Sequence, residues 1–224
     1  MGPSGSGKST LISALTRYHE LTSGSVTLLG AEADKKPFKV ARDGVTRVFQ
    51  IPHLFERVSV LDNVLTGMYR RDKYSIFDAI LRTPRYLKAN SRSVAEAKAL
   101  LSLAGMLGME ELAAGSISHG QKRLLEVIRA VATEPKILIL DEPATGLTQD
   151  EMHSLTSLIR TLAAGGMCVV LIEHNVAFLM DLADIVTVIQ SGKVIAEGTP
   201  KEVQKNERVL EAYLGNTDFS KELA

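Results

Sequence analysis

The chain has 224 residues, of which 45% are hydrophobic and 23% charged, an ordinary balance for a globular protein. Its 26 basic and 26 acidic side chains cancel, which counts against a dedicated nucleic-acid binder because such proteins usually carry a basic excess. No run of about 18 apolar residues is present, so no segment is expected to span a membrane, and the single cysteine, Cys168, excludes an internal disulfide. Because Cys168 opens an apolar run, we expect a buried thiol there.

Short apolar runs alternate with helical patterns, which favours an α/β domain. The expected strands are residues 25–29, 45–49, 137–140, 168–172, 185–189 and 193–197. The expected helices begin at Lys8, Ser59, Arg92, Gly120, Gln149 and Asn175. The runs ILIL and VVLI are apolar throughout, as in strands that are covered on both faces. Residues 59–115 are expected to form a mainly helical insertion between two parts of an α/β core, residues 1–58 and 116–224.

The segment that opens the first expected helix reads GPSGSGKS and fits the pattern G-x-x-x-x-G-K-[ST]. Its glycines let backbone amides approach phosphate oxygens, Lys8 places a charge on the β- and γ-phosphates, and the Ser9 hydroxyl can ligate Mg²⁺. The positive end of the following helix attracts the same anion. The motif predicts a phosphate-binding loop that consists of Gly2, Pro3, Ser4, Gly5, Ser6, Gly7, Lys8, Ser9 and Thr10.

Two carboxylates, Asp141 and Glu142, end the apolar run ILIL. A carboxylate at the first position can hold Mg²⁺, and one at the second can orient and deprotonate an attacking water. Such a pair can also be the ordinary acidic end of a strand. The phosphate-binding loop elsewhere in the chain favours the functional interpretation.

A polar turn with the sequence SISHGQ opens another expected helix. Ser118 and the amides around Gly120 would make a second anion-binding helix start. An ordinary N-cap would explain Ser118 taken alone.

Together these segments resemble the motifs of ABC ATPases, in the order that the family has them. Residues 117–121 resemble the signature motif, Gln50 the Q-loop glutamine and His174 the switch histidine, and residues 146–148 resemble the D-loop. The resemblance implies one ABC ATPase domain over residues 1–224. Its fold would be a P-loop NTPase (RecA-like) α/β core with a helical insertion subdomain.

The family works as head-to-tail dimers, which implies that ATP on the phosphate-binding loop of one subunit is covered by the signature motif of the other. The covering residues would be Ser118, His119, Gly120 and Gln121. Glu142 would be the general base, and His174 would contact the γ-phosphate. Gln50 would contact the metal or the water and, with Ser9 and Asp141, complete the metal set. The implied cofactors are ATP and Mg²⁺.

A finer resemblance is to the ATP-binding subunits of branched-chain amino-acid importers, and urea and amide importers share much of the pattern. It rests on residues 41–71, on the long insertion and on the segments LDEPATGLTQDE and VIAEGTPKEV. The implied protein lies at the cytoplasmic face of the membrane as a peripheral subunit that powers import. It would act with two permease subunits, a second ATPase subunit that is identical or a paralogue and, indirectly, a periplasmic or lipid-anchored substrate-binding protein. The alternatives are a weakly active or inactive fragment and a soluble, non-transport ABC ATPase.

Three features depart from the family or stand apart from its motifs. His119 occupies a position where the family most often has glycine. Since Gly2 follows Met1 directly, we expect the N-terminal strands to be missing, including one beside the Asp141 strand and one with an adenine-stacking aromatic residue. Residues 70–92 hold seven basic and two acidic side chains, a net charge of +5. That stretch would face anionic lipid head groups or a membrane partner, or would be a solvated helical face.

Overall fold

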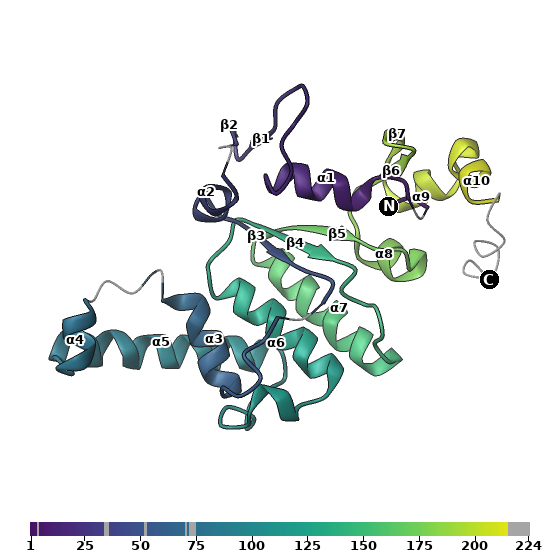
Figure 1. Ribbon diagram of the computed structural model, residues 1–224. Helices are drawn as coiled ribbons and strands as arrows, with labels where there is room; N and C mark the ends of the chain where they lie inside the picture. Colours follow the sequence, from purple (N-terminus) through teal and green to yellow (C-terminus); the bar gives the residue numbers. More distant parts are fainter. Residues whose placement is uncertain (4, 34–35, 52, 70, 72–74, 215–224) are drawn as a thin grey trace. The chain divides into compact units, whose positions relative to one another are not determined.

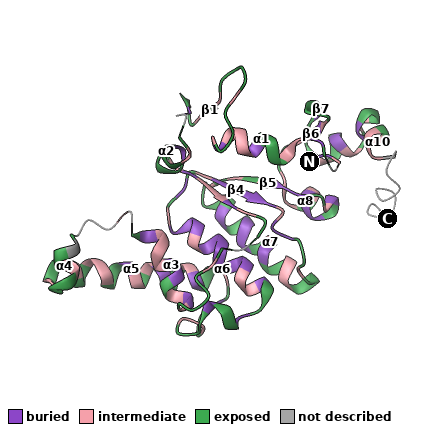
Figure 2. Ribbon diagram, in the orientation of Figure 1, coloured by how far each residue is buried: buried purple, intermediate pink, exposed green. Residues whose placement is uncertain are grey.

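The computed structural model describes residues 1–3, 5–33, 36–51, 53–69, 71 and 75–214 (Figure 1). The chain divides into two compact units. The first unit holds residues 1–47, 139–144 and 170–224, and the second holds residues 48–138 and 145–169. Each unit contains buried apolar residues of its own, drawn in purple in Figure 2.

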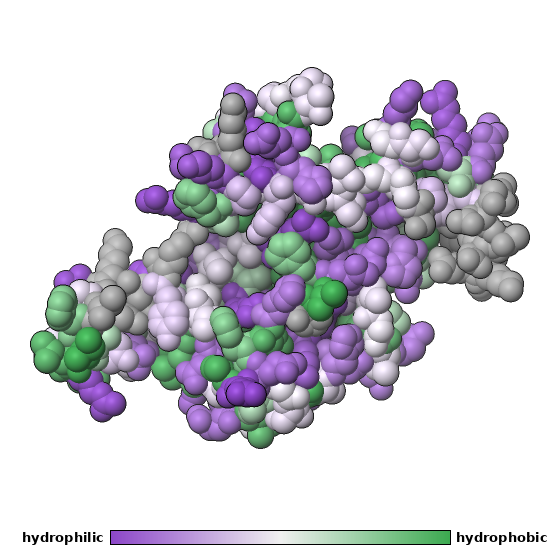
Figure 3. Space-filling model, viewed as in Figure 1, coloured by the Kyte–Doolittle hydropathy of each residue, from purple (hydrophilic) through white to green (hydrophobic). Residues whose placement is uncertain are grey.

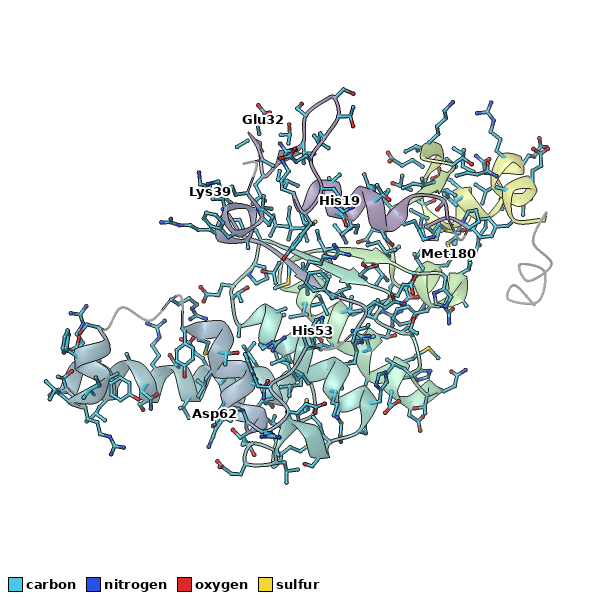
Figure 4. The ribbon with its side chains drawn as sticks, in the orientation of Figure 1. His19, Glu32, Lys39, His53, Asp62 and Met180 are labelled. Carbon is cyan, nitrogen blue, oxygen red and sulfur yellow. The ribbon has the colours of Figure 1, made fainter. Side chains whose placement is uncertain are left out.

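The first unit is built from helices and two antiparallel hairpins. Its helices are α1 (Lys8–Leu15), α2 (Pro37–Arg42), α8 (Val176–Leu182), α9 (Pro200–Gln204) and α10 (Glu207–Leu214). The hairpins are β1 (Thr27–Leu28) with β2 (Ala31–Glu32), and β6 (Val186–Gln190) with β7 (Lys193–Gly198). The core of this unit gathers around the second hairpin and consists of Met1, Val176, Leu179, Val186, Val188, Ala196, Val203 and Val209. Met180 of α8, labelled in Figure 4, packs against it.

A two-residue turn closes the β6–β7 hairpin, as its Ser-Gly sequence predicts. Gln190 pairs with Lys193, and both turn residues have positive φ, 47° at Ser191 and 75° at Gly192. This geometry matches the twist of the strands, and glycine adopts it without strain. Both α9 and α10 pack against β7.

The second unit is mainly helical. Its helices are α3 (Val60–Met68), α4 (Ile76–Ile80), α5 (Pro84–Leu103), the 3₁₀ turn η1 (Ala114–Ser116), α6 (His119–Val131) and α7 (Gln149–Ala164). Helix α3 packs against α5 and α6, and α6 packs against α7. A glycine permits the close approach of α3 to α6, because a Cβ on Gly67 would lie 2.4 Å from the carbonyl oxygen of Arg129. The expected insertion, residues 59–115, falls within this unit, which also includes α6 and α7.

Three strands, β3 (Val45–Val48), β4 (Ile137–Asp141) and β5 (Cys168–Ile172), form a sheet in the order β3-β4-β5. The N–H of Cys168 donates to the carbonyl of Lys136, and that of Glu142 to Ile172, so β4 and β5 run parallel. The expectation of a further strand beside the Asp141 strand is therefore wrong, because β4 already lies between β3 and β5. The backbone of Met1 pairs instead with β6: its amino group donates to Thr187 and its carbonyl accepts from Ile189.

Strand β5 corrects a second expectation. Its burial alternates, and both Cys168 and Val170 are exposed, so the thiol is not buried and one face of this strand is open. An apolar run alone does not reveal whether one or both faces of a strand will be covered, because a covering layer comes from elsewhere in the chain.

Most expected elements appear within one or two residues of their predicted bounds, but the helix expected at Arg92 begins eight residues earlier, at Pro84. Thr83 caps it by accepting from the N–H of Tyr86, and proline is favourable at the first position of a helix. Helices α2 and α4 are too short to give a clear periodic pattern. Across the residues that the structure describes, no helix has the length and apolar character needed to cross a membrane.

Candidate active site

The phosphate-binding loop joins the Met1 segment to α1 in the first unit. Gly7 is the N-cap of α1 with φ 97°, a conformation that favours glycine. A Cβ on Gly2 would lie only 2.0 Å from the carbonyl oxygen of Ile189. Glycine is therefore required at Gly2 by the close backbone approach and at Gly7 by the left-handed turn. Ser4 lies outside the described residues.

The side chain of Lys8 folds over this loop. Its Nζ donates to the carbonyl oxygens of Gly2 at 2.7 Å and Pro3 at 2.9 Å, and lies 3.4 Å from Ser6 Oγ. Burial lowers the pKa of Lys8, and the negative charges of Glu142 and Asp141 act in the opposite direction. A cation held between backbone carbonyls and facing carboxylates suits a phosphate-binding role. Ser9 and Thr10 lie exposed on the first turn of α1.

The two predicted carboxylates stand at the end of β4. Asp141 is its last residue, and Arg47 of β3 donates to Asp141 Oδ2 at 2.6 Å. Glu142 follows with φ 46°, in a region that is unfavourable by about 1–3 kcal/mol for a residue other than glycine. Its N–H donates to Ile172 at 2.8 Å, which holds this turn in place. Backbone strain of this kind clusters at active sites.

His174 lies beside Glu142 in the same unit. Its Nδ1 is 3.7 Å from Glu142 Oε2 and 3.9 Å from Glu173 Oε2. Both separations exceed a direct hydrogen bond. The histidine ring is largely exposed, so it can turn toward a ligand while it stays close to both carboxylates.

Glu173 is a site residue that the sequence reasoning missed. Its side chain is fully buried, and Oε1 accepts from the N–H of Ala144 at 2.8 Å. Burial raises the pKa of Glu173, and hydrogen bonds from Ala144 and the nearby charge of His174 partly oppose that effect. The carboxyl thus ties the turn after Glu142 to the turn that carries His174. The available signal was an acidic residue directly after the apolar run VVLI.

Gln50 belongs to the second unit, where α6 holds its segment through a buried ion pair. Arg123 donates to the carbonyl oxygens of Phe49, at 2.9 Å, and Gln50. The guanidinium also pairs with Glu126 at 2.9 Å, and the two side chains are only 1% and 4% exposed. Glu126 accepts in turn from the N–H of His53, labelled in Figure 4. Burial raises the pKa of Glu126, against the opposing effects of His53 and Arg123.

The signature-like segment forms the start of α6. Ser118 is the N-cap, and its side chain and that of Gln121 form a capping box. The Ser118 hydroxyl and the Gly120 N–H each donate to Glu151 Oε1 at 3.1 Å. Ser118 thus caps a helix, and its hydroxyl and the Gly120 N–H bind the carboxylate of Glu151, while the binding of a nucleotide phosphate there stays a prediction. A side chain on Gly120 would collide with Glu151, since a Cβ there would lie 2.2 Å from its carboxyl carbon.

The expected D-loop lies beside this segment. Gly146 has φ 76°, and a Cβ built on it would lie 3.5 Å from Nε2 of His119. The histidine that departs from the usual glycine of the signature motif thus packs close to Gly146, within the same unit. Glu151 sits in the first turn of the helix that follows, α7.

The donor set fits a magnesium nucleotide. Ser9 and Asp141 supply hydroxyl and carboxylate oxygens in the first unit, the kind of ligand that Mg²⁺ prefers. Gln50 supplies an amide oxygen, but it belongs to the second unit. Among the described residues, no group of three or more histidine, cysteine, aspartate or glutamate side chains could hold a metal by itself. Such a site leaves coordination positions to be filled by phosphate oxygens and water, as Mg²⁺–nucleotide sites do.

Comparisons with known proteins extend over almost the whole chain. A family described as ABC transporter matches residues 1–145, and one described as branched-chain amino acid ATP-binding cassette transporter matches residues 193–218. The high-affinity branched-chain amino acid transport ATP-binding protein LivG of Salmonella typhimurium is 36% identical over 96% of this chain and 85% of its own length. BraF of Pseudomonas aeruginosa, with the same description, is 35% identical over the same shares.

Solved structures agree with these relatives. The crystal structure of the ADP conformation of an ATP-binding cassette of an ABC transporter has a TM-score of 0.80 and 30% identity, and the match covers 96% of this chain and 86% of that one. CbiO1 from Clostridium perfringens, described as part of an ABC transporter complex, has a TM-score of 0.75 at 24% identity. The match covers 100% of this chain and 84% of that one. The latter likeness concerns the fold alone.

Proposed function

The chain belongs to the ABC transporter family as one of its ATP-binding ATPases, and from that premise we propose that it powers the import of branched-chain amino acids. The observation that carries the substrate class is the similarity to LivG and BraF along nearly the whole chain, together with the family match at residues 193–218. The fold is that of a P-loop NTPase.

The phosphate-binding loop would bind the nucleotide. Its amides and the start of α1 face the phosphates, and the Lys8 ammonium leaves its carbonyl partners to neutralise the β- and γ-phosphate oxygens. Burial lowers the pKa of Lys8, and the neighbouring charges of Glu142 and Asp141 oppose that effect. When bound, Mg²⁺ would supply further neutralisation of phosphate charge, held by Ser9, Asp141 and Gln50.

Glu142 would act as the general base. It would orient the attacking water and accept its proton. The water oxygen would bond to the γ-phosphorus as the bond from that phosphorus to the bridging oxygen of the β-phosphate breaks, so that ADP and inorganic phosphate leave. His174, close to Glu142, would donate a hydrogen bond to the charge that develops on the γ-phosphate oxygens. The buried Glu173 would act as a positioning residue, because it connects the backbone of Ala144 with the segment that carries His174.

Two copies of the cassette would complete the site. In this proposal Ser118, His119, Gly120 and Gln121 of one subunit cover the nucleotide on the loop of the other. Since Glu151 now binds the Ser118 hydroxyl and the Gly120 N–H, a phosphate group would have to replace its carboxylate there. The proposed partners are two permease subunits, a second ATPase subunit and, indirectly, a substrate-binding protein. The proposed location is the cytoplasmic face of the membrane, as a peripheral subunit.

The test of catalysis is the variant Glu142→Gln, which keeps the shape of the side chain but removes the base. We expect ATP hydrolysis to fall by about 10²–10⁴-fold while ATP binding is retained, because a general base contributes that much to the rate. Phosphate release and nucleotide binding are measured on the same preparation. Equal hydrolysis by wild type and variant would remove Glu142 from this role.

The test of the substrate class is uptake. In cells that depend on this chain for the transporter's ATPase, we expect labelled leucine, isoleucine and valine to enter with the wild type and not with Glu142→Gln. Urea and short amides serve as comparison substrates. Uptake of urea or amides alone would overturn the amino-acid assignment and leave the ATPase assignment intact.

A further inference from the structure

An exposed apolar and basic surface lies at the α4–α5 end of the second unit, and we call it the tip surface. It consists of the apolar side chains of Phe77, Ile80, Leu81 and Leu87 and the cations Arg82, Arg85 and Lys88. Figure 3 shows hydrophobic side chains gathered over α4, at the left edge of the view. None of these residues takes part in the proposed ATP site.

The tip surface projects from the packed body of its unit. The buried residues of α5 are Ser93, Ala97 and Leu101, and none of them lies among the first nine residues of the helix. The nine residues before Ser93 therefore extend past the packed region by about 13 Å, at 1.5 Å per residue. Helix α4 packs against α5. The apolar side chains of α4 are thus presented at the end of a rigid helix.

The apolar part is a helical face. Phe77, Ile80 and Leu81 stand at positions i, i+3 and i+4, which share one side of a helix. They are 76%, 71% and 72% exposed, respectively. Single exposed apolar residues are ordinary on protein surfaces, but a contiguous group of this size marks an interaction site.

The polar part of the tip surface is almost entirely cationic. Among residues 75–91 the charged side chains are Asp78, Arg82, Arg85 and Lys88, a net charge of +2. The Asp78 carboxylate accepts from Ser75 and from the Thr83 hydroxyl, which closes the turn between α4 and α5. The one acid thus fixes the turn and also attracts Arg85, and the segment keeps its net positive charge.

We infer that the tip surface docks onto the anionic lipid surface of the membrane. Apolar side chains beside arginine and lysine fit the interface of a bilayer. The apolar side chains enter the head-group region, and the cations pair with lipid phosphates. Helix α4 has five residues and can lie in this interface without crossing it. Charge complementarity favours an anionic lipid surface, since three cations and a single acid give residues 75–91 a net charge of +2.

The test uses the whole chain and protein-free vesicles, so it depends neither on ATP hydrolysis nor on a permease. We expect the wild type to sediment with vesicles of phosphatidylglycerol and phosphatidylcholine and not with phosphatidylcholine alone. Arg82→Gln/Arg85→Gln/Lys88→Gln should weaken binding by about 100-fold, because each interfacial cation contributes about fivefold. Phe77→Ser/Ile80→Ser/Leu81→Ser should weaken it by at least about tenfold.

Matched controls change the same chemistry elsewhere. Lys193→Gln/Lys201→Gln/Lys205→Gln removes three exposed cations from the first unit, and Leu103→Ser/Leu107→Ser/Leu112→Ser removes three exposed leucines from the second. Both controls should bind vesicles like the wild type, and all four variants should keep wild-type ATP hydrolysis. If the lysine control loses vesicle binding as strongly as Arg82→Gln/Arg85→Gln/Lys88→Gln, binding is general electrostatic attraction. Binding of the wild type to permease-containing vesicles only would make the tip surface a protein-docking surface; either result overturns the inference.

Discussion

At the scale of single residues, the site combines strain with burial. Glu142 occupies a left-handed conformation immediately after β4, and Glu173 is a carboxyl without solvent contact immediately after Ile172, the last residue of β5. Burial raises the pKa of Glu173 above its usual value of 4.5. A left-handed backbone is unfavourable for glutamate, and burial is unfavourable for a carboxylate. Unfavourable placements of this kind are typical of functional sites.

The raised pKa of Glu173 has a consequence for stability. A carboxyl whose pKa is raised by folding binds protons more tightly in the folded state. Its contribution to stability is therefore fully present below about pH 4.5 and is lost as the pH rises through the folded-state pKa. We expect Glu173→Gln to remove this component, so that its free energy of unfolding, relative to wild type, increases as the pH rises through that window. Urea denaturation at a series of pH values measures the difference in the free energy of unfolding between the variant and the wild type. A difference that stays constant with pH would contradict the prediction.

At the scale of elements, α6 organises the second unit. Its first turn presents Ser118 and Gly120, and the next turn carries the Arg123–Glu126 ion pair that holds the Gln50 segment. One rigid helix thus connects the signature-like segment with the Q-loop segment.

Replacing one member of the Arg123–Glu126 ion pair should lower the free energy of unfolding more than replacing both members. Arg123→Met leaves the Glu126 carboxylate buried without its partner, and we expect a loss of about 3–5 kcal/mol in the free energy of unfolding. Arg123→Met/Glu126→Leu replaces both charges by apolar groups and should recover most of that loss. Denaturant unfolding of the three proteins measures the difference. If the double variant is no more stable than the single one, the cost does not come from the uncompensated charge.

At the scale of the whole molecule, the proposed function requires two copies of the chain. Slow hydrolysis should trap the ATP-bound dimer, so we expect Glu142→Gln to elute as a dimer with ATP and as a monomer with ADP. Adding Ser118→Arg places a bulky side chain where the partner's nucleotide would lie and should abolish the dimer. Size-exclusion chromatography with light scattering measures the mass. A dimer that persists with Ser118→Arg would place the interface away from the signature-like segment.

Family, strands and most helix starts could be predicted from the sequence because they depend on local patterns. The phosphate-binding loop, the paired carboxylates after ILIL and the Ser-Gly hairpin turn each have a chemical or conformational signature within a few residues. These signals do not require knowledge of distant neighbours. Short helices such as α4 lack enough turns for a periodic pattern and were not predicted.

Other features depend on which segments meet in space. Whether Cys168 is buried depends on what covers β5, and the order β3-β4-β5 depends on pairing between strands about 30 and 90 residues apart in sequence. The partners Arg47 with Asp141, Arg123 with Glu126 and Gln50, and Glu151 with Ser118 likewise come together only on folding. The sequence by itself determined the chemistry available to this protein, because residue types and short motifs carry it. Only the tertiary structure decided which charges are buried, paired or left exposed, because burial and pairing are properties of packed neighbours.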